Sequence, residues 1–235
     1  MILSSCGGKE AFRSAYDETD LEYGVFSLAT GEELIESLET RFADHEHLWI
    51  KSDVVIRQRE EEEKDFFTAT AMWQRPGNIR LRGSRVPIGT IFDLLILRDS
   101  AFLHFPREGQ MFQGDLIYLF EKLEAIGGLG PQELVSAVLV HQQLKNRLAA
   151  GMPYRIMDSG EDGFLIAGID EATGQQFFWR IRKSDGLVDE VLVRSAGGIE
   201  MLRIPYQEYR MEESPVTGGT EPFPYEFSIF VPGRE

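Results

Sequence analysis

Cysteine and long apolar runs are nearly absent from this sequence. Cys6 is the single cysteine among 235 residues, which excludes an internal disulfide and a thiolate metal cluster. No apolar stretch is long enough to cross a bilayer as a helix. Internal repeats and low-complexity segments are also lacking. These absences leave a chain that can bury its own core, as one large β-rich domain or two small ones.

Positive charge is scarce as well. The sequence has 24 Lys and Arg residues against 39 Asp and Glu residues, and its formal net charge is -15. Nucleic-acid binding needs cations that displace the counterions of the phosphates, so the composition disfavours that role. Attachment to an anionic membrane through charge alone is disfavoured for the same reason.

Motifs for catalysis are missing. The sequence has no Gly-x-Ser-x-Gly elbow, and the glycines at 127–130 are not followed by the lysine of a phosphate loop. His45 and His47 lie beside two acids, but no third metal ligand follows at a suitable spacing, which favours a solvated connection. We therefore predict no enzymatic activity, no cofactor and no metal. A hydrolase built from scattered carboxylates is kept as a third hypothesis.

The hydrophobic periodicity changes along the chain from a helical to an extended pattern. Leu34, Leu38 and Phe42 repeat at helical spacing, which predicts a helix over 32–42. Two further helices are expected over 116–124 and from Pro131 to about residue 148, with His141 late in the second. Alternating apolar residues predict the strands 48–57, 66–74, 79–82, 91–97, 101–105, 154–157, 164–169, 175–182, 187–193, 199–209 and 225–231.

This succession predicts an α+β, mainly β fold. Short turns between successive strands favour antiparallel pairing, and about eleven strands are too many for a flat sheet. We expect one curled sheet that forms an incomplete barrel, with helices covering its concave mouth. The expected organisation is a polar tether over 1–30 and a single domain over 31–235. A packed sandwich without a cavity would show the same alternation, so the pattern does not separate the two.

The first residues resemble a bacterial lipobox. Leu3-Ser4-Ser5-Cys6 has an apolar residue, two small residues and a cysteine, the order that a signal peptidase requires before an acylated cysteine. The sequence would then start inside a signal peptide, with Cys6 lipidated and the polar residues up to 30 serving as a tether. The alternative is an ordinary cysteine near a frayed terminus.

The order of elements resembles the lipoprotein-localisation proteins of the LolA/LolB type, mainly through the stretch 73–81 and Pro87-Ile88-Gly89. That resemblance implies an incomplete barrel whose apolar cavity takes lipoprotein acyl chains. It implies partners as well: lipid or lipoprotein acyl chains, the membrane through a lipid anchor, and a periplasmic carrier protein. The implied location is the bacterial cell envelope, anchored in the outer membrane and facing the periplasm.

The resemblance assigns roles to two short segments. Arg75 corresponds to a rim arginine that bonds to the lid helices, although an ordinary exposed turn arginine is the alternative. Val86, Pro87, Ile88 and Gly89 correspond to a protruding loop whose apolar tip enters the membrane. The alternative there is that Ile88 folds back into the core.

The candidate cavity residues follow from strand alternation, which reverses if the register slips by one residue. They are Ile56, Phe67, Ala69, Trp73, Leu81, Leu95, Phe102, Phe178 and Ile181. The predicted function is a membrane-anchored lipoprotein that binds acyl chains or lipoproteins and takes part in their transfer to the outer membrane. The alternative is a non-enzymatic scaffold lipoprotein that docks an envelope complex through a packed sheet.

Overall fold

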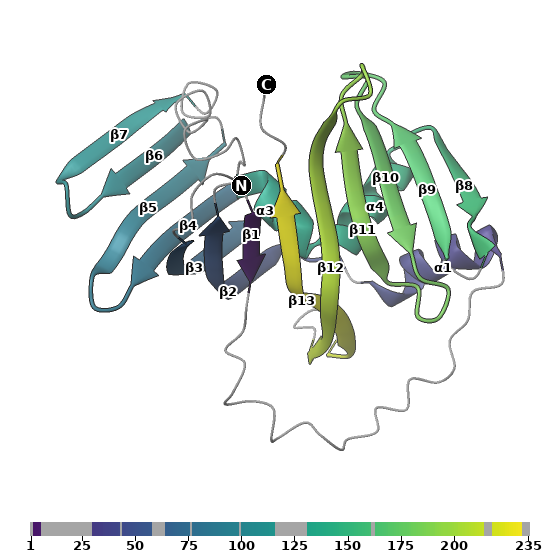
Figure 1. The fold of residues 1–235 in the computed structure, drawn as a ribbon, viewed down its shortest axis with the longest axis horizontal. Coiled ribbons are helices and arrows are strands. Elements are labelled where there is room, and N and C mark those ends of the chain that lie inside the picture. The colour runs from purple at the N-terminus through teal and green to yellow at the C-terminus, as the bar shows by residue number, and fades with distance from the viewer. Residues whose placement is uncertain are drawn as a thin grey trace. The chain divides into compact units, whose positions relative to one another are not determined.

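The fold consists of two compact units, each built around an antiparallel sheet. The computed structural model describes residues 2–5, 30–42, 44–57, 64–75, 77–98, 100–115, 131–160, 163–213 and 218–231. Unit 1 comprises Met1–Gly7, His45–Val138 and Gly233–Glu235, and unit 2 comprises Gly8–Asp44 and Leu139–Pro232. Figure 1 shows the strands of both units as arrows along the chain.

Unit 1 is a meander in which each strand pairs with the next one in the sequence. Its strands are β2 (His47–Arg57), β3 (Lys64–Gln74), β4 (Asn78–Arg85), β5 (Gly89–Leu97), β6 (Ser100–Phe105) and β7 (Gln110–Asp115). The short β1 (Ile2–Ser5) pairs with the other side of β2. The helix α3 (Pro131–Val138) lies against β4.

Unit 2 is a second meander with two helices on one face. Its strands are β8 (Tyr154–Asp158), β9 (Phe164–Ile169), β10 (Gln176–Ile181), β11 (Val188–Arg194), β12 (Glu200–Glu213) and β13 (Thr220–Phe230). The helices are α1 (Gly31–Arg41) and α4 (Val140–Ala149), which contact each other, and α1 also contacts β8.

The predicted fold class is confirmed: the chain is mainly β, its sheets are antiparallel, and they do not close. The strands number thirteen in the described residues rather than about eleven, and they belong to two units. The two additional strands are β1, which lies in the stretch expected to be a lipobox and tether, and β7, whose polar sequence hid its alternation. The strand β13 begins earlier than expected, because Pro222 and Pro224, which cannot donate to a sheet, concealed its first half. The expected helix after Pro131 is two helices, and the one over 116–124 lies outside the described residues.

The helix α1 confirms the first helix expected from the sequence. The Thr30 hydroxyl accepts a hydrogen bond from the Glu33 backbone N–H, and the Glu33 carboxylate accepts one from the Thr30 N–H, both at 3.2 Å. This capping box satisfies two backbone donors at the start of the helix. Leu34 and Leu38 are fully buried against the rest of unit 2, so the amphipathic pattern is used for packing.

His141 fastens α4 to the sheet of unit 2. Its Nε2 accepts a hydrogen bond of 3.1 Å from the Val188 backbone N–H, and its ring stacks on Phe42 with centroids 3.9 Å apart. The Tyr209 hydroxyl donates to the Val188 carbonyl at 2.7 Å. His141 is therefore the second residue of α4 and a buried acceptor, which corrects the expectation of a cation late in a helix.

The environment of His141 keeps the imidazole neutral. Burial lowers the pKa of His141 from 6.5 to about 3, and the positive charges of Arg41 and Arg182 act in the same direction. A neutral imidazole is needed here because only an unprotonated Nε2 can accept the hydrogen bond from Val188.

This environment predicts a loss of stability in acid. As the pH falls below about 6.5, His141 becomes protonated in the unfolded chain, whereas in the folded chain it stays neutral until about pH 3. The free energy of unfolding should therefore fall by ~1.4 kcal/mol per pH unit in that window. Urea titrations of the native protein and of His141→Gln, which keeps an acceptor but does not titrate, would measure the difference. Parallel loss of stability in both proteins would contradict this account.

Candidate functional site

One face of the sheet in unit 1 carries mainly apolar side chains. Phe67, Ala69, Ala71 and Trp73 alternate along β3 and share this face. The register places them opposite Val54, Ser52, Ile50 and Leu48 of β2 and, from Ala69 onward, opposite Gly83, Leu81 and Ile79 of β4. The surface formed by these residues is called the apolar face below.

The apolar face continues into β5 and β6, where it is more deeply buried. Gly83, Leu81 and Ile79 lie opposite Phe92, Leu94 and Ile96, and the last two lie opposite Leu103 and Ala101. Leu94, Ile96, Ala101 and Leu103 are 6% exposed or less, whereas the four β3 side chains are only half-buried. The face is therefore closed at β5 and β6 and partly open at β3.

Gly83 makes room for an aromatic pair on this face. A Cβ atom at Gly83 would lie 2.4 Å from the Phe92 ring, closer than atoms approach without displacement. The same ring meets Phe67 edge-on, with centroids 5.8 Å apart. A glycine at this position thus lets Phe92 lie across β4 and reach β3, which extends the aromatic surface.

The structure brings together only part of the predicted cavity set. Phe67, Ala69, Trp73 and Leu81 lie on the apolar face, whereas the side chain of Ile56 lies outside the described residues. Leu95 and Phe102 are cross-strand partners on the opposite face, beside Arg80. The run Leu94-Leu95-Ile96-Leu97 is apolar on both faces, so alternation alone did not decide which of its residues point to the apolar face.

Phe178 and Ile181 belong to unit 2 and occupy opposite faces of its sheet. Ile181 is fully buried in the core with Phe164 and Trp179. Phe178 lies on the other face, where the Arg194 guanidinium is 5.2 Å from the centre of its ring. The covered face of unit 2 is thus filled by its own side chains.

The remaining predicted site residues lie in turns or outside the described residues. Arg75 is exposed in the turn between β3 and β4, and its backbone N–H donates to the Glu46 carbonyl at 2.9 Å. Its role at a cavity rim stays a prediction. Cys6 lies outside the described residues, so its lipidation also stays a prediction.

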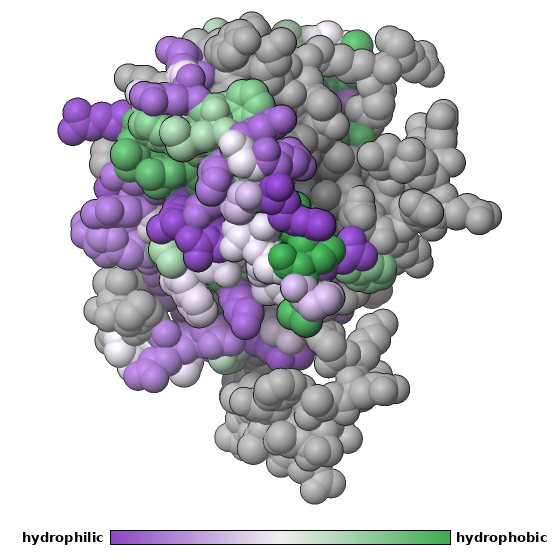
Figure 2. All heavy atoms as spheres, turned by 90° about the vertical axis from the view of Figure 1, so that its left-hand side faces the viewer, coloured by the Kyte–Doolittle hydropathy of each residue, from purple (hydrophilic) through white to green (hydrophobic). Residues whose placement is uncertain are grey.

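The hairpin tip between β4 and β5 presents apolar side chains to solvent. Val86 is 95% exposed and Ile88 is 40% exposed, and Arg85, Pro87 and Gly89 around them are exposed as well. Figure 2, in which the left-hand side of Figure 1 faces the viewer, shows hydrophobic patches separated by hydrophilic residues on this side. Ile88 therefore does not fold back into the core.

A carboxylate held by two arginines fixes the register of β4 and β5 behind this tip. Asp93 accepts two hydrogen bonds from Arg80, at 3.0 and 2.7 Å, and two from Arg82, at 3.2 and 2.7 Å. These hydrogen bonds, first those from Arg80, lower the pKa of Asp93 to about 2 although partial burial opposes the shift. The sequence analysis missed this cluster, whose signal was the alternation of Arg80 and Arg82 within one strand.

Replacing this carboxylate should weaken the β4–β5 hairpin. Asp93→Asn leaves two guanidinium groups close together without a counter-charge, so we expect a loss of about 1–2 kcal/mol in the free energy of unfolding. Asp189→Asn is the matched control, because Asp189 accepts from Arg180 alone, with its Nη2 at 2.8 Å. The measurement is urea denaturation at neutral pH. Equal losses in the two variants would show that the second arginine adds nothing.

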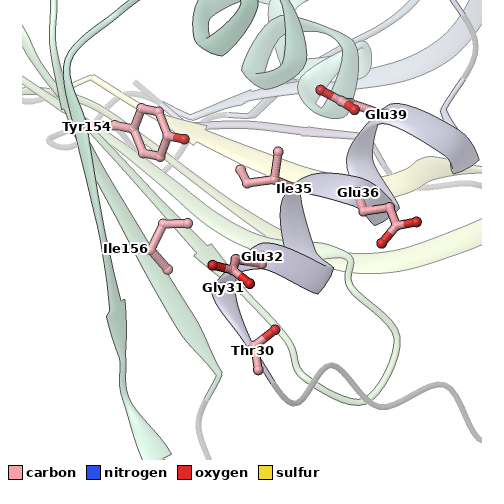
Figure 3. Close-up of a pocket in the computed structure, with 8 residues that line it drawn as sticks. All are labelled: Thr30, Gly31, Glu32, Ile35, Glu36, Glu39, Tyr154 and Ile156. Atoms are coloured by element: carbon pink, nitrogen blue, oxygen red, sulfur yellow. The ribbon is translucent and has the colours of Figure 1, made fainter.

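A groove between α1 and β8 in unit 2 was not expected from the sequence. It has a volume of about 690 Å³ and is lined by Thr30, Gly31, Glu32, Ile35, Glu36, Glu39, Tyr154 and Ile156. Figure 3 shows Ile35 of α1 and the two β8 side chains, Tyr154 and Ile156, facing one another across the gap. Local patterns could not have found this groove because its two sides are more than a hundred residues apart.

Among the described residues there is no cluster of three or more side chains suited to holding a metal ion. None of the helices in this part of the chain has the length and apolarity needed to span a membrane.

Comparison with known proteins gives matches only among solved structures. No protein-family model matches the chain, and no curated protein matches it. One similar structure is a candidate outer membrane lipoprotein-sorting protein domain from Vibrio parahaemolyticus, with 10% identity and a TM-score of 0.46, covering 86% of this chain and 89% of that one. A LolA superfamily protein from Nitrosomonas europaea has 12% identity and a TM-score of 0.44, with coverages of 86% and 90%.

A third similar structure is a DUF1329 family protein from Desulfovibrio piger, with 9% identity, a TM-score of 0.45 and coverages of 84% and 87%. One of these matches is a LolA superfamily protein, the type that the sequence resembles. The TM-scores of all three structures lie below 0.5.

Proposed function

We propose that this chain binds hydrocarbon tails on the apolar face of unit 1 and works in a bacterial cell envelope. The observation that supports this is the apolar surface formed by Phe67, Ala69 and Trp73, which is only half-buried. Partly open apolar surface is unfavourable in water, and covering it with acyl chains contributes ~0.8 kcal/mol per buried methylene. No covalent step is needed for such binding.

The hairpin tip would be the part of the chain that contacts the membrane. Val86 and Ile88 are exposed apolar side chains at the tip of the β4–β5 hairpin, and such side chains can enter the acyl region of a bilayer. The proposed sequence of events is contact of the tip with a membrane and exchange of acyl chains at the apolar face. Acylation of Cys6 would anchor the chain, and Arg75 would bond to lid segments at the rim of the face.

The packed interior of unit 2 supports a second role beside lipid binding. Phe164, Trp179 and Ile181 fill its covered face, so this face is a packed core and not a ligand cavity. A non-enzymatic scaffold lipoprotein that docks an envelope complex therefore remains the alternative. Native mass spectrometry of the purified chain separates the two roles, because co-purified lipid supports carriage and a clean apo mass supports the scaffold.

The tryptophans allow a direct test of the apolar face. Trp73 lies on this face, whereas Trp49 lies on the opposite face of the same sheet and is 63% exposed. Bromine quenches indole fluorescence at short range, so a brominated fatty acid should quench Trp49→Phe, which keeps Trp73. Trp73→Phe, which keeps Trp49, is the control and should not respond, and Trp179 of the unit 2 core is kept in both variants. Absence of quenching at Trp73, or equal quenching of both, would overturn the proposal.

A second test uses charge to block the face. Ala71→Glu places a carboxylate among Ile50, Leu81 and their neighbours, so binding of a fluorescent fatty acid should weaken by about tenfold or more. Thr70→Glu adds the same charge one residue away, on the opposite face beside Arg82, and should leave binding unchanged. Thermal unfolding would verify that both variants fold. Equal affinity of the two variants would contradict the assignment of the face.

The hairpin tip has its own test. Val86→Ser combined with Ile88→Ser should reduce sedimentation of the unacylated chain with phosphatidylethanolamine–phosphatidylglycerol vesicles, because it removes the apolar contacts that enter the bilayer. The control combines Ile199→Ser with Met201→Ser, which removes two apolar side chains that are exposed elsewhere. The idea fails if both double variants sediment like the native protein.

A further inference from the structure

The groove between α1 and β8 has apolar side chains on both sides and acidic residues along its α1 edge. Ile35 and Ile156 are half-buried and Tyr154 is 43% exposed, so these side chains are accessible to a ligand. Gly31 allows the start of α1 to approach β8, because a Cβ atom there would already lie 3.2 Å from the Ile156 side chain. The two sides of the groove therefore lie close together at the end near Gly31.

The acidic edge is a stripe along α1. Glu32, Glu36 and Glu39 follow one another at helical spacing, so they lie on one side of the helix. All three are exposed, and none of the ion pairs recorded within the described ranges uses them. None of the eight residues that line the groove is a lysine or an arginine. The groove therefore lacks a counter-charge of its own.

We propose that this groove is a docking site for a basic segment of a partner protein. The segment would place one apolar side chain on Ile35, Tyr154 and Ile156, with lysine or arginine on either side facing the glutamates. Charge complementarity with the stripe of Glu32, Glu36 and Glu39 selects such an occupant. A purely apolar ligand such as an acyl chain would leave these carboxylates unmatched, so the site is distinct from the apolar face of unit 1.

The volume agrees with this occupant. About 690 Å³ is enough for a few side chains of one short segment and too little for a folded domain. The interaction should be of modest affinity and sensitive to salt, because exposed ion pairs are weak individually and are screened.

The test measures binding of a synthetic peptide to the full chain by fluorescence anisotropy. The probe is a labelled amphipathic helical peptide with lysines at helical spacing around one leucine, and a peptide with glutamates in place of the lysines serves as the reference. We expect binding of the lysine peptide alone, weakening as salt is raised. The triple variant Glu32→Gln, Glu36→Gln and Glu39→Gln should weaken it by about tenfold or more. Glu33 is left unchanged because it caps the helix.

The matched control removes the same amount of charge elsewhere in unit 2. Glu171→Gln, Glu212→Gln and Glu213→Gln change three exposed acids that do not line the groove and should leave the affinity unchanged. Ile35→Ala should weaken binding without altering charge, which separates a seated side chain from general attraction. Equal weakening by both triple variants, no effect of Ile35→Ala, or no binding of the lysine peptide would each overturn the proposal. Lipid binding by unit 1 is unaffected by any of these outcomes.

Discussion

The two-residue period of the extended chain is the constraint on which this protein depends. In both meanders it collects uncharged side chains on one face and leaves the ionic ones on the other. The same rule puts Ala71 of β3 beside Ile50 and Leu81, while Thr70 lies beside Lys51 and Arg82. Each sheet therefore has a hydrophobic face that must be covered by something.

The two units meet this requirement in different ways. In unit 2 the helices α1 and α4 cover the apolar side chains, and His141 joins α4 to the Val188 backbone as a neutral acceptor. His141 is thus held in this core in its uncharged form. In unit 1 the face is tight at Leu94 and Ile96 but half-open at Phe67 and Trp73. A packed core supports a rigid body, whereas a half-open one leaves surface for a ligand.

The polar contacts complement this division of roles. Asp93 accepts hydrogen bonds from Arg80 and Arg82 and so stabilises the hairpin that carries Val86 and Ile88 at its tip. The acids along α1 line one side of a groove on unit 2, where they would repel an anionic membrane and attract a basic segment. Hydrocarbon and protein partners would accordingly be recognised by different chemistry on different units.

Sequence by itself determined the mainly β class, the antiparallel pairing of successive strands and the helix α1, because hydrophobic period and turn residues are local signals. It also placed Phe67, Ala69, Trp73 and Leu81 together. Only the tertiary structure decided that Leu95 and Phe102 face the other way and that Ile181 lies in a separate core. A strand that is apolar on both sides has no preferred face until its neighbours fix the register. The groove, likewise, exists only where Ile35 and Ile156, distant in sequence, are brought within reach.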